Sequence, residues 1–326
     1  MAELTQEIRT ILNESHRTLV VSHVDPDGDA IGTQLAFGHY LRDIGKEVLI
    51  VRDSIISSKY LFLPEVDSII EIESLNNQND FDVAVVLECP TPDRMGAVAQ
   101  LISPNTRIIN IDHHPANILE AEVSWVDTSL SSVGEMTFEF FQSVGYTICP
   151  EVATQLYTAI LTDTGRFRYS CTGPRTLEIA GELVRSGADP REICDHVYFE
   201  MTPELVQLTG ELLHDLEYRN DGRICFMTLT RDHLARTGVD PSDTEGLIDY
   251  TLYPRGVEIG ALLRDIEPQL TKISLRSRPG IDVAVIAARF GGGGHVNAAG
   301  CHVELPIEAA KDKIIQLLQE ARESQV

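Results

Sequence analysis

The chain has few basic residues for its size. Its 326 residues include 26 lysines and arginines against 50 aspartates and glutamates, a net charge of −24 at pH 7. Proteins that coat long nucleic acid do so through many phosphate contacts with basic side chains, so this balance argues against that class. A small anionic substrate is not excluded, because bound cations and a few local arginines reverse the field inside a cleft.

The sequence also lacks a hydrophobic run as long as a membrane span, a basic and apolar signal-peptide pattern at its start, and any Cys-x-x-Cys motif. Its six cysteines are scattered at positions 89, 149, 171, 194, 225 and 301. We therefore expect a cytoplasmic protein with reduced thiols and no membrane partner. The length allows two domains with full hydrophobic cores.

The first half of the chain alternates apolar runs with helical patterns, which predicts an α/β fold with a parallel sheet. The expected strands are 18–22, 47–51, 82–88 and 107–114, and the expected helices are 132–144, 151–161 and 174–187. From Arg223 onward, strands are expected at 224–229, 257–264 and 270–276, with helical segments near 242–252, 283–289 and 306–321. The pattern predicts a domain at 1–190, a helical connector at 191–215 and a smaller α/β domain at 216–326, with a cleft between the domains.

Ionisable side chains crowd the end of the first expected strand, where His23, Asp25, Asp27 and Asp29 follow one another. Side chains at this end of a strand face the crevice in which open α/β sheets bind ligands. One imidazole and three carboxylates would repel one another there unless a cation lies among them. These ligand types suit Mn²⁺ or Mg²⁺, with Zn²⁺ or Fe²⁺ as alternatives. Asp29 is expected to cap the helix that follows.

Other interpretations of this stretch remain open at this point. It resembles a polar turn whose aspartates only cap the next helix, and aspartyl-phosphate phosphatases also place Asp-x-Asp after a strand. An EF-hand is excluded, because that loop needs glycine at its sixth position and glutamate at its twelfth. Counted from Asp25, those positions hold Ala30 and Ala36.

Three further element ends carry acidic or imidazole groups. Glu88 closes one expected strand, Asp112-His113-His114 closes another, and Asp163 ends an apolar helical segment. One such cluster is typical of a surface turn, but four at successive elements indicate a shared site. Two cations about 3.5–4 Å apart can clamp a phosphoryl group and activate a water for in-line attack. The candidate ligands suffice for two such metals sharing one carboxylate: His23, Asp27, Asp29, Glu88, His113 and Asp163.

These motifs, in this order, resemble those of the DHH superfamily of phosphoesterases, and within it the nanoRNase and 3′-phosphoadenosine 5′-phosphate phosphatase group. The matching segments are 23–29, the 112–114 triplet, 162–165 and the glycine-rich stretch 290–300 of a DHH-associated C-terminal domain. The resemblance covers essentially the whole chain. It implies an enzyme with two Mn²⁺ ions, or Mg²⁺ or Co²⁺ in their place, that hydrolyses short oligoribonucleotides or removes the 3′-phosphate of the nucleotide.

The resemblance also implies residue roles. His23 and Asp27 would hold one metal, with Asp29, His113 and Asp163 on the other and Glu88 as the bridge. His114 would face the substrate phosphate as general acid or electrostatic stabiliser, and Asp112 would orient the imidazoles. Apart from the resemblance, four successive glycines let the backbone approach a ligand closely and can form an anion nest, with a flexible loop as the alternative. The substrate contacts would be Arg94, Arg264, Arg276, Gly292, Gly293, Gly294 and His295.

Glu88 departs from the family pattern, which usually has aspartate at this position. Either the site accommodates the longer arm and is active, or catalysis has decayed and the chain is a nucleotide-binding sensor. A phosphatase for another small phosphate ester is a further alternative. The expected partner is short RNA or a small nucleotide, without long nucleic acid or membrane. The sequence is compatible with a monomer and with a homodimer.

Overall fold

The computed structural model describes residues 2–75, 80–115, 117–244 and 246–323. The chain divides into two compact units, Met1–Glu200 and Met201–Val326. This division falls inside the segment 191–215, for which the sequence predicts a connector. Within the described ranges, no helix is long and apolar enough to cross a membrane.

The N-terminal unit is built on a six-stranded parallel sheet with the strand order β3-β2-β1-β4-β5-β6. This confirms the predicted parallel sheet, although the sequence did not indicate β3 and β6. The strand order reverses between β1 and β4, and open sheets of this kind bind ligands at the carboxyl ends of the strands beside that point. The strands are β1 (Arg17–Val21), β2 (Glu47–Arg52), β3 (Ile69–Glu71), β4 (Val83–Leu87), β5 (Arg107–Asp112) and β6 (Val123–Val126).

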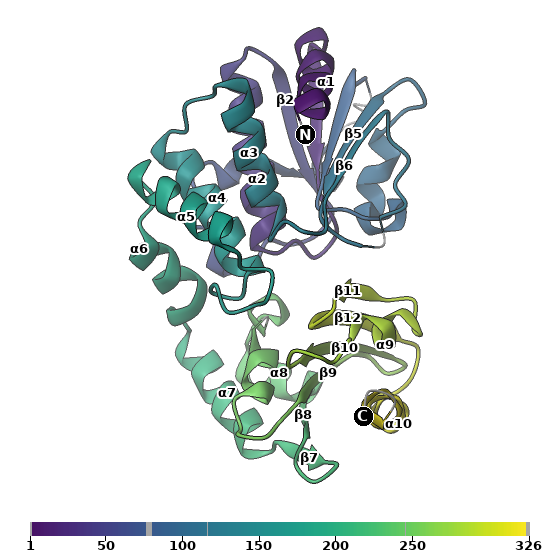
Figure 1. Cartoon of the computed structure of the whole chain (residues 1–326). Coiled ribbons are helices and arrows are strands. Elements are labelled where there is room, and N and C mark those ends of the chain that lie inside the picture. The colour runs from purple at the N-terminus through teal and green to yellow at the C-terminus, as the bar shows by residue number, and fades with distance from the viewer. Residues whose placement is uncertain (1, 76–79, 116, 245, 324–326) are drawn as a thin grey trace. The chain divides into compact units, whose positions relative to one another are not determined.

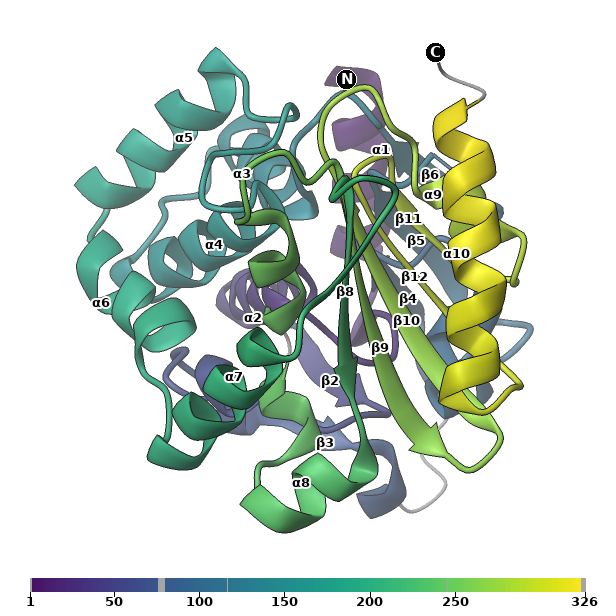
Figure 2. The same cartoon turned by 90° about the horizontal axis from the view of Figure 1, so that it is seen from below.

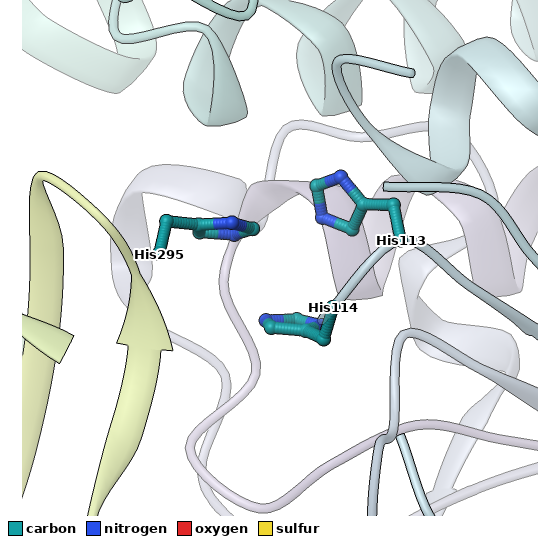
Figure 3. A group of neighbouring side chains, drawn as sticks. All are labelled: His113, His114 and His295. Carbon is teal, nitrogen blue, oxygen red and sulfur yellow. The ribbon is translucent and has the colours of Figure 1, made fainter. Parts of the chain in front are cut away.

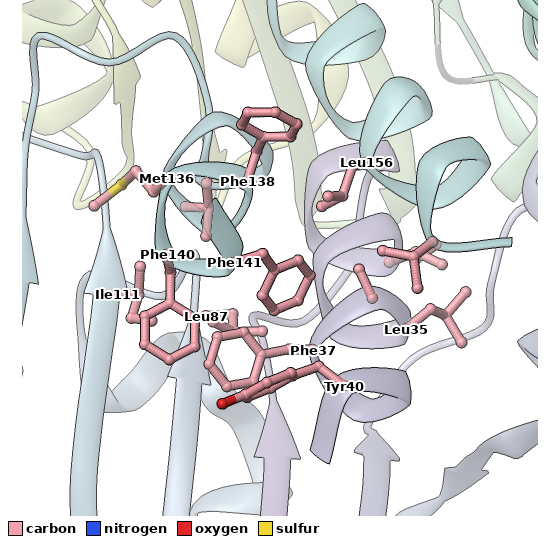
Figure 4. Packing of buried hydrophobic residues seen from close by; sticks show 14 of the residues in the cluster. Leu35, Phe37, Tyr40, Leu87, Ile111, Met136, Phe138, Phe140, Phe141 and Leu156 are labelled. Carbon is pink, nitrogen blue, oxygen red and sulfur yellow. The ribbon is translucent and has the colours of Figure 1, made fainter. Parts of the chain in front are cut away.

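Helices cover both faces of this sheet, as the wholly buried β4 requires. Helices α1 to α4 share one core, in which Phe37 stacks on Phe140 and Tyr40 contacts Phe141 (Figures 1 and 4). The 3₁₀ segment η4 covers the other face. The helical elements are α1 (Ala2–Glu14), α2 (Gly28–Asp43), η1 (Ser58–Tyr60), η2 (Val66–Ser68), η3 (Ile72–Ser74), η4 (Pro92–Leu101), α3 (Val133–Val144), α4 (Pro150–Asp163), α5 (Pro174–Arg185), α6 (Pro190–Cys194) and the π-helical η5 (Asp195–Phe199).

Helices α2 and α4 approach so closely that a glycine is needed at their contact. A Cβ atom on Gly28 would lie 2.5 Å from Oγ1 of Thr162. The last turn of α4 therefore packs on the first turn of α2. Helix packing thus brings Asp163 beside the first motif, which is distant from it in sequence.

The C-terminal unit is a smaller α/β domain, as predicted, but its sheet is mixed. The strand order is β11-β12-β10-β9-β8-β7, in which β8 and β9 are parallel and the other pairs antiparallel. Helices α9 and α10 cover one face of the sheet (Figure 2). The other face packs on α7 and η7. The elements are α7 (Pro203–His214), β7 (Glu217–Arg219), β8 (Ile224–Leu229), α8 (Arg231–Thr237), η6 (Pro241–Thr244), η7 (Leu247–Leu252), β9 (Ile259–Glu267), β10 (Leu270–Ser277), α9 (Ala284–Ala288), β11 (Gly293–His295), β12 (Ala298–Val303) and α10 (Ile307–Glu323).

The glycine-rich stretch ends a helix and starts a strand. The N–H groups of Gly291 and Gly292 donate to carbonyl groups of α9, at 3.0 Å each, and residues 293–295 form β11. A Cβ atom on Gly292 would overlap the carbonyl oxygen of Gly300 on β12. Tight packing therefore explains this glycine. The anion-nest prediction is wrong for Gly291 and Gly292, because their N–H groups are used inside the fold.

Candidate metal centre

Two groups of potential ligand atoms meet where β1, β4 and β5 end. His23, Asp27 and Glu88 form one group, and Asp29, Glu88 and His113 form the other. Within each group the ligand atoms lie within 4.8 Å of one another, and Glu88 belongs to both. Asp163 joins them, with Oδ2 at 3.3 Å from Nε2 of His113. The structure thus brings together all six residues that the sequence predicts as ligands.

Backbone carbonyl groups orient the two imidazole rings of these groups. Nδ1 of His23 lies 2.7 Å from the carbonyl oxygen of Val24, and Nδ1 of His113 lies 3.3 Å from that of Leu130. Since a carbonyl oxygen only accepts, Nδ1 carries the proton in each ring and Nε2 offers a lone pair. Burial lowers the pKa of His23 and lowers that of His113 to about 4, so both rings are neutral at pH 7.

Each of these lone pairs faces a carboxylate. Nε2 of His23 lies 3.2 Å from Oε2 of Glu88, and Nε2 of His113 lies 3.3 Å from Oδ2 of Asp163. With the proton on Nδ1, both atoms of each pair are acceptors, so they repel one another unless a cation or a proton lies between them. The arrangement fits a bound cation.

The two aspartates of the first motif have different structural tasks, and one prediction is corrected. Asp27, not Asp29, caps α2, because its Oδ1 accepts the N–H groups of Asp29 at 3.0 Å and Ala30 at 3.1 Å. Asp29 instead accepts the N–H groups of Val133 at 2.7 Å and Gly134 at 2.8 Å, at the start of α3. These hydrogen bonds to Asp29 therefore connect the first turn of α2 to the start of α3. Asp25 is exposed.

Glu88 lies directly after β4 and is 2% exposed. Its backbone is left-handed, with a φ of 53°, a conformation that costs free energy for residues other than glycine. Burial, followed by the charges of Asp27, Asp29 and Asp163, raises the pKa of Glu88 well above its usual range. The strand end is thus strained and electrostatically unfavourable in the absence of a cation.

Asp29 experiences the same repulsion. Burial and the Asp27 carboxylate raise the pKa of Asp29 to about 8, although the two N–H groups that it accepts from α3 act to lower it. Burial would raise the pKa of Asp27 too, but His23 and the N–H groups that Asp27 caps outweigh burial and lower it. Buried carboxylates that repel one another beside two imidazole lone pairs are a donor set for a hard or borderline divalent cation.

His114 leaves the same strand end as His113, with the ring centroids 5.1 Å apart and the rings at 74° (Figure 3). Its Nδ1 donates to Oδ1 of Asp112 at 2.8 Å. Asp112 is fully buried. Burial would raise the pKa of Asp112, but hydrogen bonds from His114 and Asn117 outweigh it and lower the pKa.

The predicted substrate contacts are more dispersed. Arg94 is exposed on η4, and its carbonyl oxygen accepts the N–H of Val24 at 2.7 Å, so it adjoins the first motif. In the C-terminal unit, Arg264 donates to the carbonyl oxygen of Pro241 at 2.9 Å, and Nε of Arg276 lies 3.7 Å from Asp249. His295, also drawn in Figure 3, ends β11. Gly292 precedes β11, and Gly293 and Gly294 belong to it.

One residue at this strand end was missed in the sequence. Asn117 donates to Oδ2 of Asp112 at 2.6 Å. No spacing rule indicates it, because the contact depends on how the loop after His114 turns back toward β5.

Comparison with known proteins identifies the class. Residues 17–160 match the DHH family, N-terminal domain, and residues 221–324 match the DHHA1 domain. Together with the relatives described next, these matches show that the chain belongs to the DHH family, with a DHHA1 domain in its C-terminal unit. The resemblance seen in the motifs is therefore confirmed.

Particular relatives narrow the comparison. The chain is 33% identical to the bifunctional oligoribonuclease and PAP phosphatase NrnA of Thermus thermophilus, over 92% of this chain and 89% of that protein. It is 27% identical to the protein of the same name from Bacillus subtilis, over 92% of this chain and 93% of that protein. Among solved structures, an exopolyphosphatase-related protein from Bacteroides fragilis matches with a TM-score of 0.89 and 26% identity, covering 99% of this chain and 96% of that one.

Proposed function

We propose that this protein is a metal-dependent phosphoesterase that hydrolyses short oligoribonucleotides to mononucleotides and removes the 3′-phosphate of 3′-phosphoadenosine 5′-phosphate. The observation that carries the proposal is the shared position of Glu88 in two groups of ligand atoms. Support for the substrates comes from the relatives named as oligoribonuclease and PAP phosphatase. The net charge of −24 further favours short substrates over long strands.

The proposed centre holds two divalent cations, with Mn²⁺ as the first choice and Mg²⁺ or Co²⁺ as alternatives. His23 and Asp27 would hold one cation, and Asp29, His113 and Asp163 would hold the other. Glu88 would be a ligand available to both, since it belongs to both groups of ligand atoms. When bound, the cations would supply a nucleophilic water and polarise the phosphoryl oxygens. The two imidazole–carboxylate pairs support this assignment, because Nε2 of His23 lies 3.2 Å from Glu88 and Nε2 of His113 lies 3.3 Å from Asp163.

His114 is proposed to act on the substrate itself. Its Nδ1–H donates to Asp112, and Nε2 is the ring atom that would contact a phosphate oxygen or give a proton to the leaving oxygen. Asp112 is buried and ionised, and it stabilises the positive charge that the ring carries when it is protonated. This arrangement of carboxylate and imidazole favours an active enzyme over the alternative of a nucleotide-binding sensor.

The C-terminal unit is proposed to bind the part of the substrate that does not react. Arg276 and His295 are the main candidates, with Arg94 from the N-terminal unit. Remote contacts of this kind hold a reacting phosphate in line for attack.

Product analysis tests the proposal. The protein is incubated with RNAs of two to 24 nucleotides, with 3′-phosphoadenosine 5′-phosphate and with inorganic polyphosphate, in Mn²⁺ and in Mg²⁺. We expect mononucleotides, released fastest from RNAs of about two to five nucleotides, and adenosine 5′-phosphate from the nucleotide. Asp67→Asn, an exposed change in η2, is the control for a lost surface charge.

Binding of nucleotide without hydrolysis in any of these metals would instead support the sensor alternative. Preferred hydrolysis of polyphosphate would assign the site to another phosphate ester. Digestion of a 24-mer as fast as a dinucleotide would contradict the preference for short RNA.

A further inference from the structure

We propose that Asn117 is a positioning residue that holds His114 in its working orientation by acting through Asp112. This inference rests on the proposed function, in which His114 contacts the substrate. It assigns a task to a residue outside the motifs that define the site.

The two oxygens of Asp112 have separate partners. Oδ1 accepts Nδ1–H of His114 at 2.8 Å, together with the backbone N–H groups of His113 at 2.8 Å and His114 at 3.2 Å. Oδ2 accepts Nδ2–H of Asn117 at 2.6 Å. Because the donor from Asn117 holds Oδ2, the carboxylate cannot rotate Oδ1 away from the imidazole without losing a hydrogen bond to a buried charge.

A second asparagine sets the orientation of the Asn117 amide. Oδ1 of Asn117 accepts Nδ2–H of Asn110 at 2.9 Å and the N–H of Leu119 at 3.1 Å. With its oxygen engaged by two donors, the amide must direct its NH₂ group toward Asp112. Asn110 is fully buried on β5, two residues before Asp112, so it projects from the same face of the sheet. The series of hydrogen-bonded side chains that leads from Asn110 through Asn117 and Asp112 to His114 therefore starts on a strand of the sheet.

A purely structural role makes a different prediction. Because Asn117 also accepts the N–H of Leu119, its side chain could serve only to shape the loop after the Asp-His-His triplet. Asn117→Asp keeps that acceptor but removes the donor to Asp112 and places a second carboxylate against it. Asn117→Ala removes both. If Asn117 only shapes the loop, Asn117→Ala alone should be impaired. If it orients Asp112, both substitutions should be impaired.

The test compares these variants with wild type on a ribodinucleotide at pH 8.5 in Mg²⁺, where both carboxyl groups are ionised. We expect Asn117→Asp and Asn117→Ala each to lower kcat by about 10–100-fold, as for other residues that orient active-site histidines, with KM changed less than about threefold. Asn105→Asp, an exposed turn position, is the control for an added charge. Asn117→Asp with wild-type kcat beside an impaired Asn117→Ala would overturn the proposal.

A second readout does not depend on turnover. In a ¹⁵N-edited NMR spectrum with Mg²⁺, the Nδ1–H proton of His114 should resonate far downfield, since it is bound to a carboxylate. We expect Asn117→Asp to shift or remove this signal while the thermal midpoint stays within a few degrees. An unchanged signal would overturn the inference. If Asn117→Asp shifts the Nδ1–H signal as expected but the wild-type protein does not hydrolyse the dinucleotide, the proposed function would be wrong and the positioning role of Asn117 would stand.

Discussion

Glu88→Asp tests whether the site has adapted to the longer side chain. The substitution shortens the arm by one methylene group and draws the carboxylate back by about 1.5 Å. Glu88 now reaches two groups of ligand atoms, with Oε2 at 3.2 Å from Nε2 of His23. The carboxylate of the shorter aspartate would no longer lie within reach of both groups of ligand atoms.

The expected loss is large. A displacement of about 1 Å at a reacting centre can cost about 10²-fold in rate. We therefore expect kcat of Glu88→Asp on a ribodinucleotide to fall by about 100-fold in Mn²⁺, or about 2.7 kcal/mol of activation free energy. Folding should not explain the loss, because Asp adopts the left-handed backbone of this position, at a φ of 53°, at least as readily as Glu.

The assay follows initial rates at saturating Mn²⁺, with thermal unfolding measured on the same samples. Glu88→Gln, similar in shape but neutral, should also fail because an amide bridges cations poorly. A Glu88→Asp protein more active than wild type would refute the adapted site and indicate that catalysis in wild type had decayed.

Three further predictions concern the same centre. Asp163→Ala should abolish turnover while unfolding stays cooperative, and near wild-type rates in saturating Mn²⁺ would contradict its assignment as a ligand. His295→Ala should raise KM or lower kcat without changing metal affinity, and an equal loss of Mn²⁺ binding by calorimetry would instead place it among the ligands. Because the pKa of Asp29 is raised to about 8, the metal-free fold holds a proton at pH 7 that the unfolded chain has released, and the raised pKa of Glu88 acts in the same direction. Since the lowered pKa values of His23 and His113 act in the opposite direction below about 6.5, the free energy of unfolding of the metal-free protein should fall as pH rises from about 6.5 toward 8. Mn²⁺ binding should release protons, seen as calorimetric heats that depend on the buffer. Heats independent of the buffer would contradict this.

Much of the N-terminal fold could be predicted because its strands are short apolar runs that end in polar motifs. The apolar run before His23 and the run before Glu88 both form central strands of the sheet. Once these runs are parallel neighbours, the polar residues after them must meet at one edge. This is why the candidate ligands that follow strands could be grouped from the sequence, whereas Asp163, at the end of α4, reaches them through the packing of α4 on α2.

The failed expectations depend on tertiary contacts that residue spacing does not show. Whether Asp27 or Asp29 caps α2 could not be decided from spacing, since Asp29 is engaged by Val133 and Gly134, more than 100 residues later. The expected nest fails at Gly291 and Gly292 because their N–H groups donate to carbonyl groups of α9. Asn117 was missed because its hydrogen bonds to Asp112 and Asn110, which are close in sequence, depend on how the chain turns back toward β5.

Rates of dinucleotide hydrolysis after removal and return of the metal test the central claim most directly. The protein is treated with a chelator, dialysed, and assayed with a ribodinucleotide and a 24-mer while Mn²⁺ is added back. We predict no hydrolysis without metal, recovery with added Mn²⁺, and a clear preference for the dinucleotide. Hydrolysis that persists at full rate in the metal-free protein, or none at any Mn²⁺ concentration, would contradict the account.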